Sequence, residues 1–273
     1  MLISGEQINP TPSWQDLLHP GDATDFFLRR PFPDFDPAIS SYSAINALWL
    51  AELSRLVYRH DAEEESQPPQ PTRTRFLEKA GFKQRQFFFS RETDTQAMLV
   101  EYCGLSPFVV LVFRGAEQNI RDYFTSFEIG SGVLDIHERD VHSGFRKALD
   151  SVWSRIDTAL ADINCPVFYT GHSLGAALAT LAAARHAPRA AYLFGSPRVG
   201  NKAFADSLCD VPVYRIVDDE DVIATIPSEA MGFLHVGTEI RLIAPRHEFS
   251  INQIIAPPKR WADHAPINYI DRI

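Results

Sequence analysis

Cysteine is scarce in this chain of 273 residues, and its three copies are far apart at Cys103, Cys165 and Cys209. An odd and small number of cysteines does not make a disulfide framework. No Cys-x-x-Cys pair occurs, so the sequence gives no sign of a structural zinc site. Nothing else in the sequence indicates a metal or an organic cofactor, and we expect neither.

Long apolar runs and an excess of positive charge are also missing. No apolar run reaches the length of about 18 residues that indicates a transmembrane helix. No basic segment followed by an apolar core occurs at the N-terminus, so no cleavable signal peptide is predicted. We expect a cytoplasmic protein, or one exported without a cleavable N-terminal signal. The formal net charge of −9 argues against nucleic acid and anionic membranes as partners, so any transient binding to a lipid surface would depend on exposed apolar groups.

The composition is that of a globular protein, with 45% hydrophobic and 22% charged residues. The length suits one α/β domain with a substantial core. Residues 1–40 contain six prolines and are expected to form an irregular arm. Residues 41–273 are expected to form the main domain, beginning with an amphipathic helix at 41–59.

Strands and helices alternate through the second half of the chain. Short apolar runs predict strands at 83–89, 95–103, 108–114, 166–171, 190–195 and 212–217. Helical patterns occupy 144–163, 174–186 and 202–209. This alternation predicts the α/β class, with a mostly parallel central sheet that carries helices on both faces.

Gly171-His172-Ser173-Leu174-Gly175 matches the G-x-S-x-G motif of a nucleophile elbow. A predicted strand ends directly before the motif and a long helix follows it, which is the context that the elbow requires. The first amides of that helix favour a developing negative charge. We therefore predict that Ser173 is a nucleophile; the alternative is an inert serine in a turn. His172 is expected to pack and hydrogen-bond behind the elbow.

The chain resembles the class 3 lipases, the α/β hydrolases typified by fungal triacylglycerol lipases, in several patches that occur in the same order. The patches are Phe113-Arg114-Gly115, Val141-His142-Ser143-Gly144-Phe145, residues 171–183, the segment FGSPRVGN at 194–201, the acidic turn before Pro227, and Asp263-His264 followed by Tyr269. FGSPRVGN at this distance from the serine motif is the most specific of them. The resemblance covers roughly residues 43–270 and implies an α/β-hydrolase fold.

A serine nucleophile needs a base, and in these folds the acid and then the histidine follow the serine. His264 matches the position of the family's catalytic histidine, and His247 is the second candidate. His186 ends the helix after the serine and is expected to point away from it. His235 lies in the strand-like segment 233–240, which reads as structural.

The acid is expected in the turn Asp218-Asp219-Glu220-Asp221, directly after the predicted strand 212–217. The family pattern puts the acid before a short apolar run that ends in proline, and Asp221 fits that pattern. Asp218 is the second candidate. An acid at this place would hold the imidazole in one tautomer and stabilise the imidazolium.

An oxyanion hole needs two backbone N–H donors. One is the amide of Leu174, which follows the nucleophile, and the other is assigned to Ala116, in the loop after strand 108–114. The family usually has serine or threonine at the second position. Alanine keeps the amide but supplies no hydroxyl, which predicts a somewhat lower rate or a changed substrate preference.

A lid is predicted at residues 118–129, where Ile120, Tyr123, Phe124 and Phe127 form one apolar stripe of a short helix. In the family this segment is the lid, and our hypothesis is that the stripe covers the active site in water and moves to expose an acyl-binding groove at a lipid surface. The alternative is an ordinary helix that stays buried on the sheet.

The resemblance implies a serine ester hydrolase that cleaves acylglycerols or other carboxylic esters through a covalent acyl-enzyme. Its partner would be a lipid or ester substrate. Phospholipase A1, feruloyl-type esterase and thioesterase activities are the close alternatives, and an acyltransferase is a further one. A non-catalytic lipid-binding relative is the alternative of another class, against which the intact Ser173, Asp221 and His264 argue.

Overall fold

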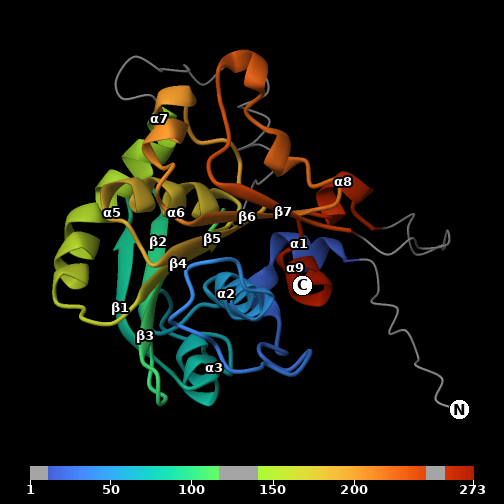
Figure 1. Ribbon diagram of the computed structural model, residues 1–273. Helices are drawn as coiled ribbons and strands as arrows, with labels where there is room; N and C mark the ends of the chain where they lie inside the picture. Colours follow the sequence, from blue (N-terminus) through green and yellow to red (C-terminus); the bar gives the residue numbers. More distant parts are fainter. Residues whose placement is uncertain (1–11, 117–140, 244–255) are drawn as a thin grey trace, which may run out of the picture.

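Two layers of helices enclose one sheet in this computed structural model, which describes residues 12–116, 141–243 and 256–273 (Figure 1). Within these ranges the sheet has seven strands, in the order β1-β2-β3-β4-β5-β6-β7. Antiparallel pairs join β1, β2 and β3, and parallel pairs join β3 to β7. The strands are β1 (Phe82–Ser90), β2 (Thr95–Tyr102), β3 (Phe108–Phe113), β4 (Val167–His172), β5 (Ala190–Phe194), β6 (Val213–Asp218) and β7 (Thr238–Leu242). The predicted α/β class is confirmed.

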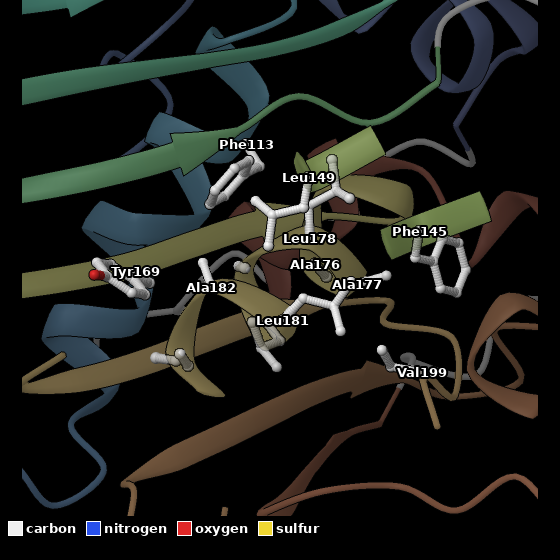
Figure 2. Close-up of a cluster of buried hydrophobic side chains, with 14 of the residues drawn as sticks. Phe113, Phe145, Leu149, Tyr169, Ala176, Ala177, Leu178, Leu181, Ala182 and Val199 are labelled. Carbon is white, nitrogen blue, oxygen red and sulfur yellow. The ribbon is translucent and has the colours of Figure 1, made fainter. Parts of the chain in front are cut away.

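On one face of the sheet lie α5 (Ser143–Ala161), α6 (Leu174–Arg185) and α7 (Lys202–Ser207) (Figure 1). The alanines of α6 favour the helix and let it approach both the sheet and α5, so its residues 175–183 are buried. Figure 2 shows α6 side chains such as Leu178 among Phe113 and Tyr169 of the sheet and Leu149 of α5. This packing fixes the start of α6 at the carboxyl end of β4.

The opposite face carries α2 (Ala44–Leu56), α3 (Arg73–Lys79) and α9 (Pro266–Arg272), which pack on a second apolar cluster. Ser43 caps α2 by accepting a hydrogen bond from the amide of Asn46, the usual way to begin a helix. The short α8 (Lys259–Ala262) precedes α9. The short helices α3, α8 and α9 were not predicted, because four to seven residues show little helical periodicity, although α7, of six residues, was predicted.

The proline-rich arm packs into this second cluster. It contains the short helix α1 (Trp14–Leu18), which Ser13 and Asp16 cap reciprocally, and a 3₁₀ turn at Pro20–Asp22. Phe35 is buried and stacks on Phe108 of β3 with a ring-centroid distance of 4.0 Å. The described part of the arm therefore contributes to the core of the domain.

The segment between β6 and β7 differs from the prediction. It contains two 3₁₀ turns, η2 (Ile223–Thr225) and η3 (Glu229–Met231). β7 begins only at Thr238, so His235 lies ahead of the strand and not within it. No helix in the described ranges is both long and apolar enough to cross a membrane.

Candidate active site

Ser173 stands at the junction of β4 and α6, where its backbone adopts φ 59° and ψ −125°. A positive φ is unfavourable for a residue with a side chain, so the surrounding structure must enforce it. One such constraint is the hydrogen bond of 2.9 Å from the Ser173 amide to the carbonyl of Phe194 on β5. The Ser173 hydroxyl is buried and has no hydrogen-bond partner among the described residues. Strain of this kind is characteristic of a nucleophile elbow.

The loop after β3 lies directly against this elbow. A Cβ added to Gly115 would be 2.7 Å from the carbonyl oxygen of His172 and 2.0 Å from the hydroxyl of Tyr58, so only glycine fits there. Ala116 follows and packs on the same core cluster as α6. Ala116 and Leu174, the two expected oxyanion donors, therefore belong to segments that lie side by side.

Asp221 and His264 are joined by a buried hydrogen bond. The turn after β6 is closed by the amide of Asp221, which donates to the carbonyl of Asp218 over 2.8 Å. Oδ2 of Asp221 lies 2.8 Å from Nδ1 of His264, and Oδ1 accepts from the Ile223 amide at 2.8 Å. Both side chains are buried. The pair therefore has the geometry of the acid and base of a hydrolytic triad.

The environment of Asp221 keeps its carboxylate charged. Burial alone would raise the pKa of Asp221, but the charge and hydrogen bond of His264, the Tyr269 hydroxyl and the Ile223 amide together lower it. An ionised carboxylate only accepts hydrogen bonds, so Nδ1 of His264 carries the proton. When the ring is neutral, Nε2 is then the basic nitrogen, as a general base for a serine requires.

Tyr269, on α9, donates a hydrogen bond of 2.6 Å to the same Oδ2 atom of Asp221. Burial and the charge of Asp221 hold the pKa of the Tyr269 phenol well above its usual value, so the hydroxyl stays protonated and donates. The sequence pointed to Tyr269 only as part of a family pattern. Its role was missed because a position five residues after His264 does not reveal where the side chain points.

His172 connects the elbow to the segment that carries His264. Its Nε2 lies 2.8 Å from the carbonyl oxygen of His264, and its Nδ1 lies 3.0 Å from the hydroxyl of Tyr58. The carbonyl can only accept, so Nε2 carries the hydrogen. Burial and the neighbouring His264 hold the pKa of His172 well below its usual value, so the ring is neutral and Nδ1 accepts from Tyr58. This is the supporting role expected from the sequence.

Asp218, the second candidate for the acid, does not reach His264. Its carboxylate is paired with the Arg272 guanidinium. Burial raises the pKa of Asp218 to about 7, although Arg272 acts in the opposite direction. Asp218 therefore lies beside the pair of Asp221 and His264 without belonging to it.

The other described histidines downstream of Ser173 are engaged elsewhere. His186 follows α6, where its Nδ1 lies 2.9 Å from the hydroxyl of Tyr169. His235 donates from Nε2 to the carbonyl of Ala224 over 2.7 Å. Burial, and to a smaller extent the positive charge of Arg215, lowers the pKa of His235 to about 3. Both roles agree with the structural interpretation of these residues. The candidate His247 and the predicted lid residues Ile120, Tyr123, Phe124 and Phe127 lie outside the described residues.

A strained serine between a strand and a helix, together with a buried aspartate–histidine pair whose histidine carbonyl contacts His172 directly before that serine, defines the α/β-hydrolase arrangement. Within that class, the family model described as lipase (class 3) matches residues 110–231. Over this stretch the chain is similar to the class 3 lipases, and the resemblance inferred from its motifs is confirmed.

Individual relatives agree with this relationship. The secreted mono- and diacylglycerol lipase 1 of Fusarium solani is 34% identical over 143 residues, which are 48% of this chain and 43% of that protein. The chloroplastic phospholipase A(1) DAD1 of Arabidopsis thaliana is 39% identical over 108 residues, or 36% of this chain and 24% of that protein. The chain thus spans less than half of these curated relatives.

The solved structure of lipase II from Rhizopus niveus superimposes with a TM-score of 0.60 at 24% identity, covering 72% of this chain and 80% of that one. At this identity the likeness shows the fold alone. It confirms the predicted α/β-hydrolase fold over most of the chain.

Proposed function

We propose that this protein is a serine ester hydrolase with Ser173 as nucleophile, His264 as general base and Asp221 as the acid that orients it. The observation that carries the proposal is the buried 2.8 Å hydrogen bond between Asp221 and His264, whose carbonyl contacts His172 directly before a serine with φ 59°. An inert serine in a turn would have no need of either feature.

The reaction would proceed by two acyl transfers. Ser173 Oγ attacks the ester carbonyl carbon while Nε2 of His264 takes the hydroxyl proton, and the charge of Asp221 stabilises the imidazolium. The amides of Leu174 and Ala116 would stabilise the oxyanion. His264 then protonates the leaving alcohol. Water attacks the acyl-enzyme with His264 again as base, which releases the acid and restores Ser173.

Neutral acylglycerols are the substrate class that we favour. The Fusarium relative is named a mono- and diacylglycerol lipase. The formal net charge of −9 would repel an anionic lipid surface, whereas a neutral glyceride surface carries no such penalty. The match to a phospholipase A(1) makes phospholipid hydrolysis the second candidate. Rates on dioleoylglycerol and phosphatidylcholine, compared at equal surface concentration, separate the two.

Access to the buried Ser173 requires movement of the surrounding chain. The lid at residues 118–129 stays a prediction from the sequence, and its hallmark would be a rise in activity when the substrate exceeds its solubility. An unchanged rate of Phe124→Ser on emulsions, together with a smooth dependence on substrate concentration, would reject it.

The secreted Fusarium relative favours export as the location of this protein. Immunodetection in the culture medium and in the cell lysate of the native source tests this. Recovery in the lysate alone would favour the cytoplasmic alternative.

The function itself is tested by hydrolysis of p-nitrophenyl butyrate and palmitate with the wild type and Ser173→Ala, purified in parallel. We expect turnover of at least one ester by the wild type, with a loss on the order of 10³-fold or more in the variant. Equal inactivity of both proteins, combined with binding of a fatty acid, would favour the non-catalytic lipid-binding alternative.

A further inference from the structure

Asp263 is a buried carboxylate that lies directly before His264 and is only 2% exposed. Its Oδ2 accepts a hydrogen bond from the backbone amide of Glu220 at 3.2 Å and lies 2.8 Å from Nζ of Lys259. Its Oδ1 lies 3.1 Å from the guanidinium of Arg272. A buried carboxylate is costly unless it is paired and hydrogen-bonded, so these contacts stabilise one arrangement of the chain around it.

A hydrogen bond of Asp263 joins the same two turns as the hydrogen bond between the two proposed catalytic side chains. Glu220 directly precedes Asp221, just as Asp263 directly precedes His264. The hydrogen bond between Glu220 and Asp263 therefore joins the same two turns as the hydrogen bond between Asp221 and His264. The first bond fixes the spacing of the backbone from which the second must form.

Arg272 extends this connection to a third element. From the last turn of α9 its guanidinium contacts both Asp263 and Asp218, the final residue of β6. One cation thus holds the end of the strand and the turn before His264 together. Charge-assisted bonds of this kind are about twice as strong as neutral ones.

Such a connection matters here because neither proposed catalytic side chain lies on a long element. Asp221 lies in a turn, and His264 lies between α8, of four residues, and α9, of seven. Helices this short are not stable by themselves, so their orientation depends on cross-links to the rest of the fold.

We propose that Asp263 is a positioning residue which, together with Arg272, holds the turn of His264 in register with the turn of Asp221. The inference rests on the proposed function, since it takes His264 and Asp221 as the base and the acid. Asp263 touches no reacting atom, and its effect on the reaction would pass through the orientation of His264.

The test compares Asp263→Asn and Arg272→Met with the matched control Arg29→Met. Arg29 also forms a half-buried ion pair with α9, through Asp271 at 2.7 Å, and it binds Asp25 at 2.8 Å. Loss of Arg29 therefore loosens the same helix without touching Asp263. The readouts are kcat and KM on p-nitrophenyl butyrate, the rate of Ser173 labelling by a fluorophosphonate, and the melting temperature.

We expect kcat and the labelling rate to fall about 10- to 100-fold in Asp263→Asn and Arg272→Met with little change in KM, the loss that follows a misplacement near 1 Å. The loss in the double variant should be smaller than the product of the two single losses, because both substitutions remove the contact between Asp263 and Arg272. Arg272→Lys should recover part of the rate. Arg29→Met should lower the melting temperature and keep the wild-type kcat.

Wild-type kcat and labelling in both Asp263→Asn and Arg272→Met would overturn the inference, as would an equal loss of kcat in Arg29→Met. Failure of the proposed function would give a different result, because the wild type itself would then neither hydrolyse esters nor react with the fluorophosphonate. In that case the positioning role would be rejected together with the proposed function. Should Asp263→Asn not fold, Arg272→Met and Arg272→Lys decide the matter.

Discussion

The hydroxyl of Tyr269 and Nδ1 of His264 share one atom, Oδ2 of Asp221, at distances of 2.6 and 2.8 Å. Two donors on one oxygen fix the direction of the carboxylate and hence the plane of the imidazole. Tyr269 therefore supports the proposed base without contact to the substrate. The phenol of Tyr269 and the main-chain contact of His172 to His264 constrain the same histidine from different sides.

Removal of the Tyr269 hydroxyl is expected to weaken catalysis and to shift its pH dependence. Tyr269→Phe deletes a hydrogen bond to a buried charge, a contact that contributes about 1.5–3 kcal/mol, so we expect kcat to fall roughly 10- to 100-fold. Because that bond lowers the pKa of Asp221, its loss raises this pKa and moves the acid limb of kcat/KM to higher pH. Profiles from pH 4 to 9 check this.

Tyr214→Phe is the matched control, since Tyr214 donates to the carbonyl of Ser40 at 2.8 Å, away from the site. Its pH profile should equal that of the wild type. A Tyr269→Phe enzyme with the wild-type profile and kcat would show that the phenol only fills space.

Gly195 is expected to tolerate no side chain because it faces the same three groups. Its φ is +56°, and an added Cβ would lie 2.6 Å from Oδ2 of Asp221 and 2.8 Å from both Nδ1 of His264 and the Tyr269 hydroxyl. Gly195→Ala should therefore force the acid and the base apart and reduce kcat by about 100-fold or more. Steady-state kinetics normalised to the folded fraction measure the effect.

Gly232→Ala separates backbone strain from contact with the site. Gly232 has a similar φ of +85°, but an added Cβ would meet no atom within 4 Å. Both alanines should lower stability by about 1–3 kcal/mol, and only Gly195→Ala should lower kcat. Equal kcat values in the two variants would mean that the site absorbs the methyl group.

The sequence predicted well those features that depend on local pattern. The alternation of strands and helices specified the sheet, and the glycines around Ser173 together with the alanine-rich run after it marked the junction of β4 and α6. Asp221 and His264 were named from a family pattern, and their hydrogen bond agrees with that choice. Their catalytic roles, and the oxyanion donors, stay predictions.

Features that depend on the direction of a side chain were beyond the sequence. Asp218 and Asp221 are three residues apart with the same functional group, and only the turn between them sends one to Arg272 and the other to His264. The roles of Tyr269 and Asp263 could not be predicted for the same reason, because the sequences of α8 and α9 are too short to show which face of each helix is buried.

Asp218 is expected to make the stability of the protein fall as the pH rises. Burial raises the pKa of its carboxyl from the ordinary value of 3.8 to about 7 in the folded protein. The folded state then binds more protons than the unfolded state between about pH 4 and pH 7, so the free energy of unfolding decreases with pH across that window. Below it the stabilising contribution is fully present, and above it the contribution is lost.

Urea unfolding of the wild type and Asp218→Asn at intervals from pH 4.5 to 8 checks this. Asparagine resembles the protonated carboxyl and does not titrate, so the wild type should lose stability relative to the variant as the pH rises, by an amount on the order of a few kcal/mol. A difference that is constant with pH would show that Asp218 stays ionised throughout, as its contact with Arg272 favours.

Ala116→Ser is expected to raise the rate of the proposed hydrolysis. Ala116 follows the loop residue Gly115, which lies against the carbonyl of His172, and its methyl group supplies no donor. A serine hydroxyl there can add a third hydrogen bond to the oxyanion. Deletion of one such donor costs about 10²- to 10³-fold in kcat, so its addition at an unoptimised position should give a smaller gain, of roughly 2- to 10-fold, with KM unchanged.

Ala116→Val, which changes the size of the side chain but adds no donor, is the control. A serine variant no faster than the wild type would indicate that the Ala116 side chain points away from the reacting carbonyl.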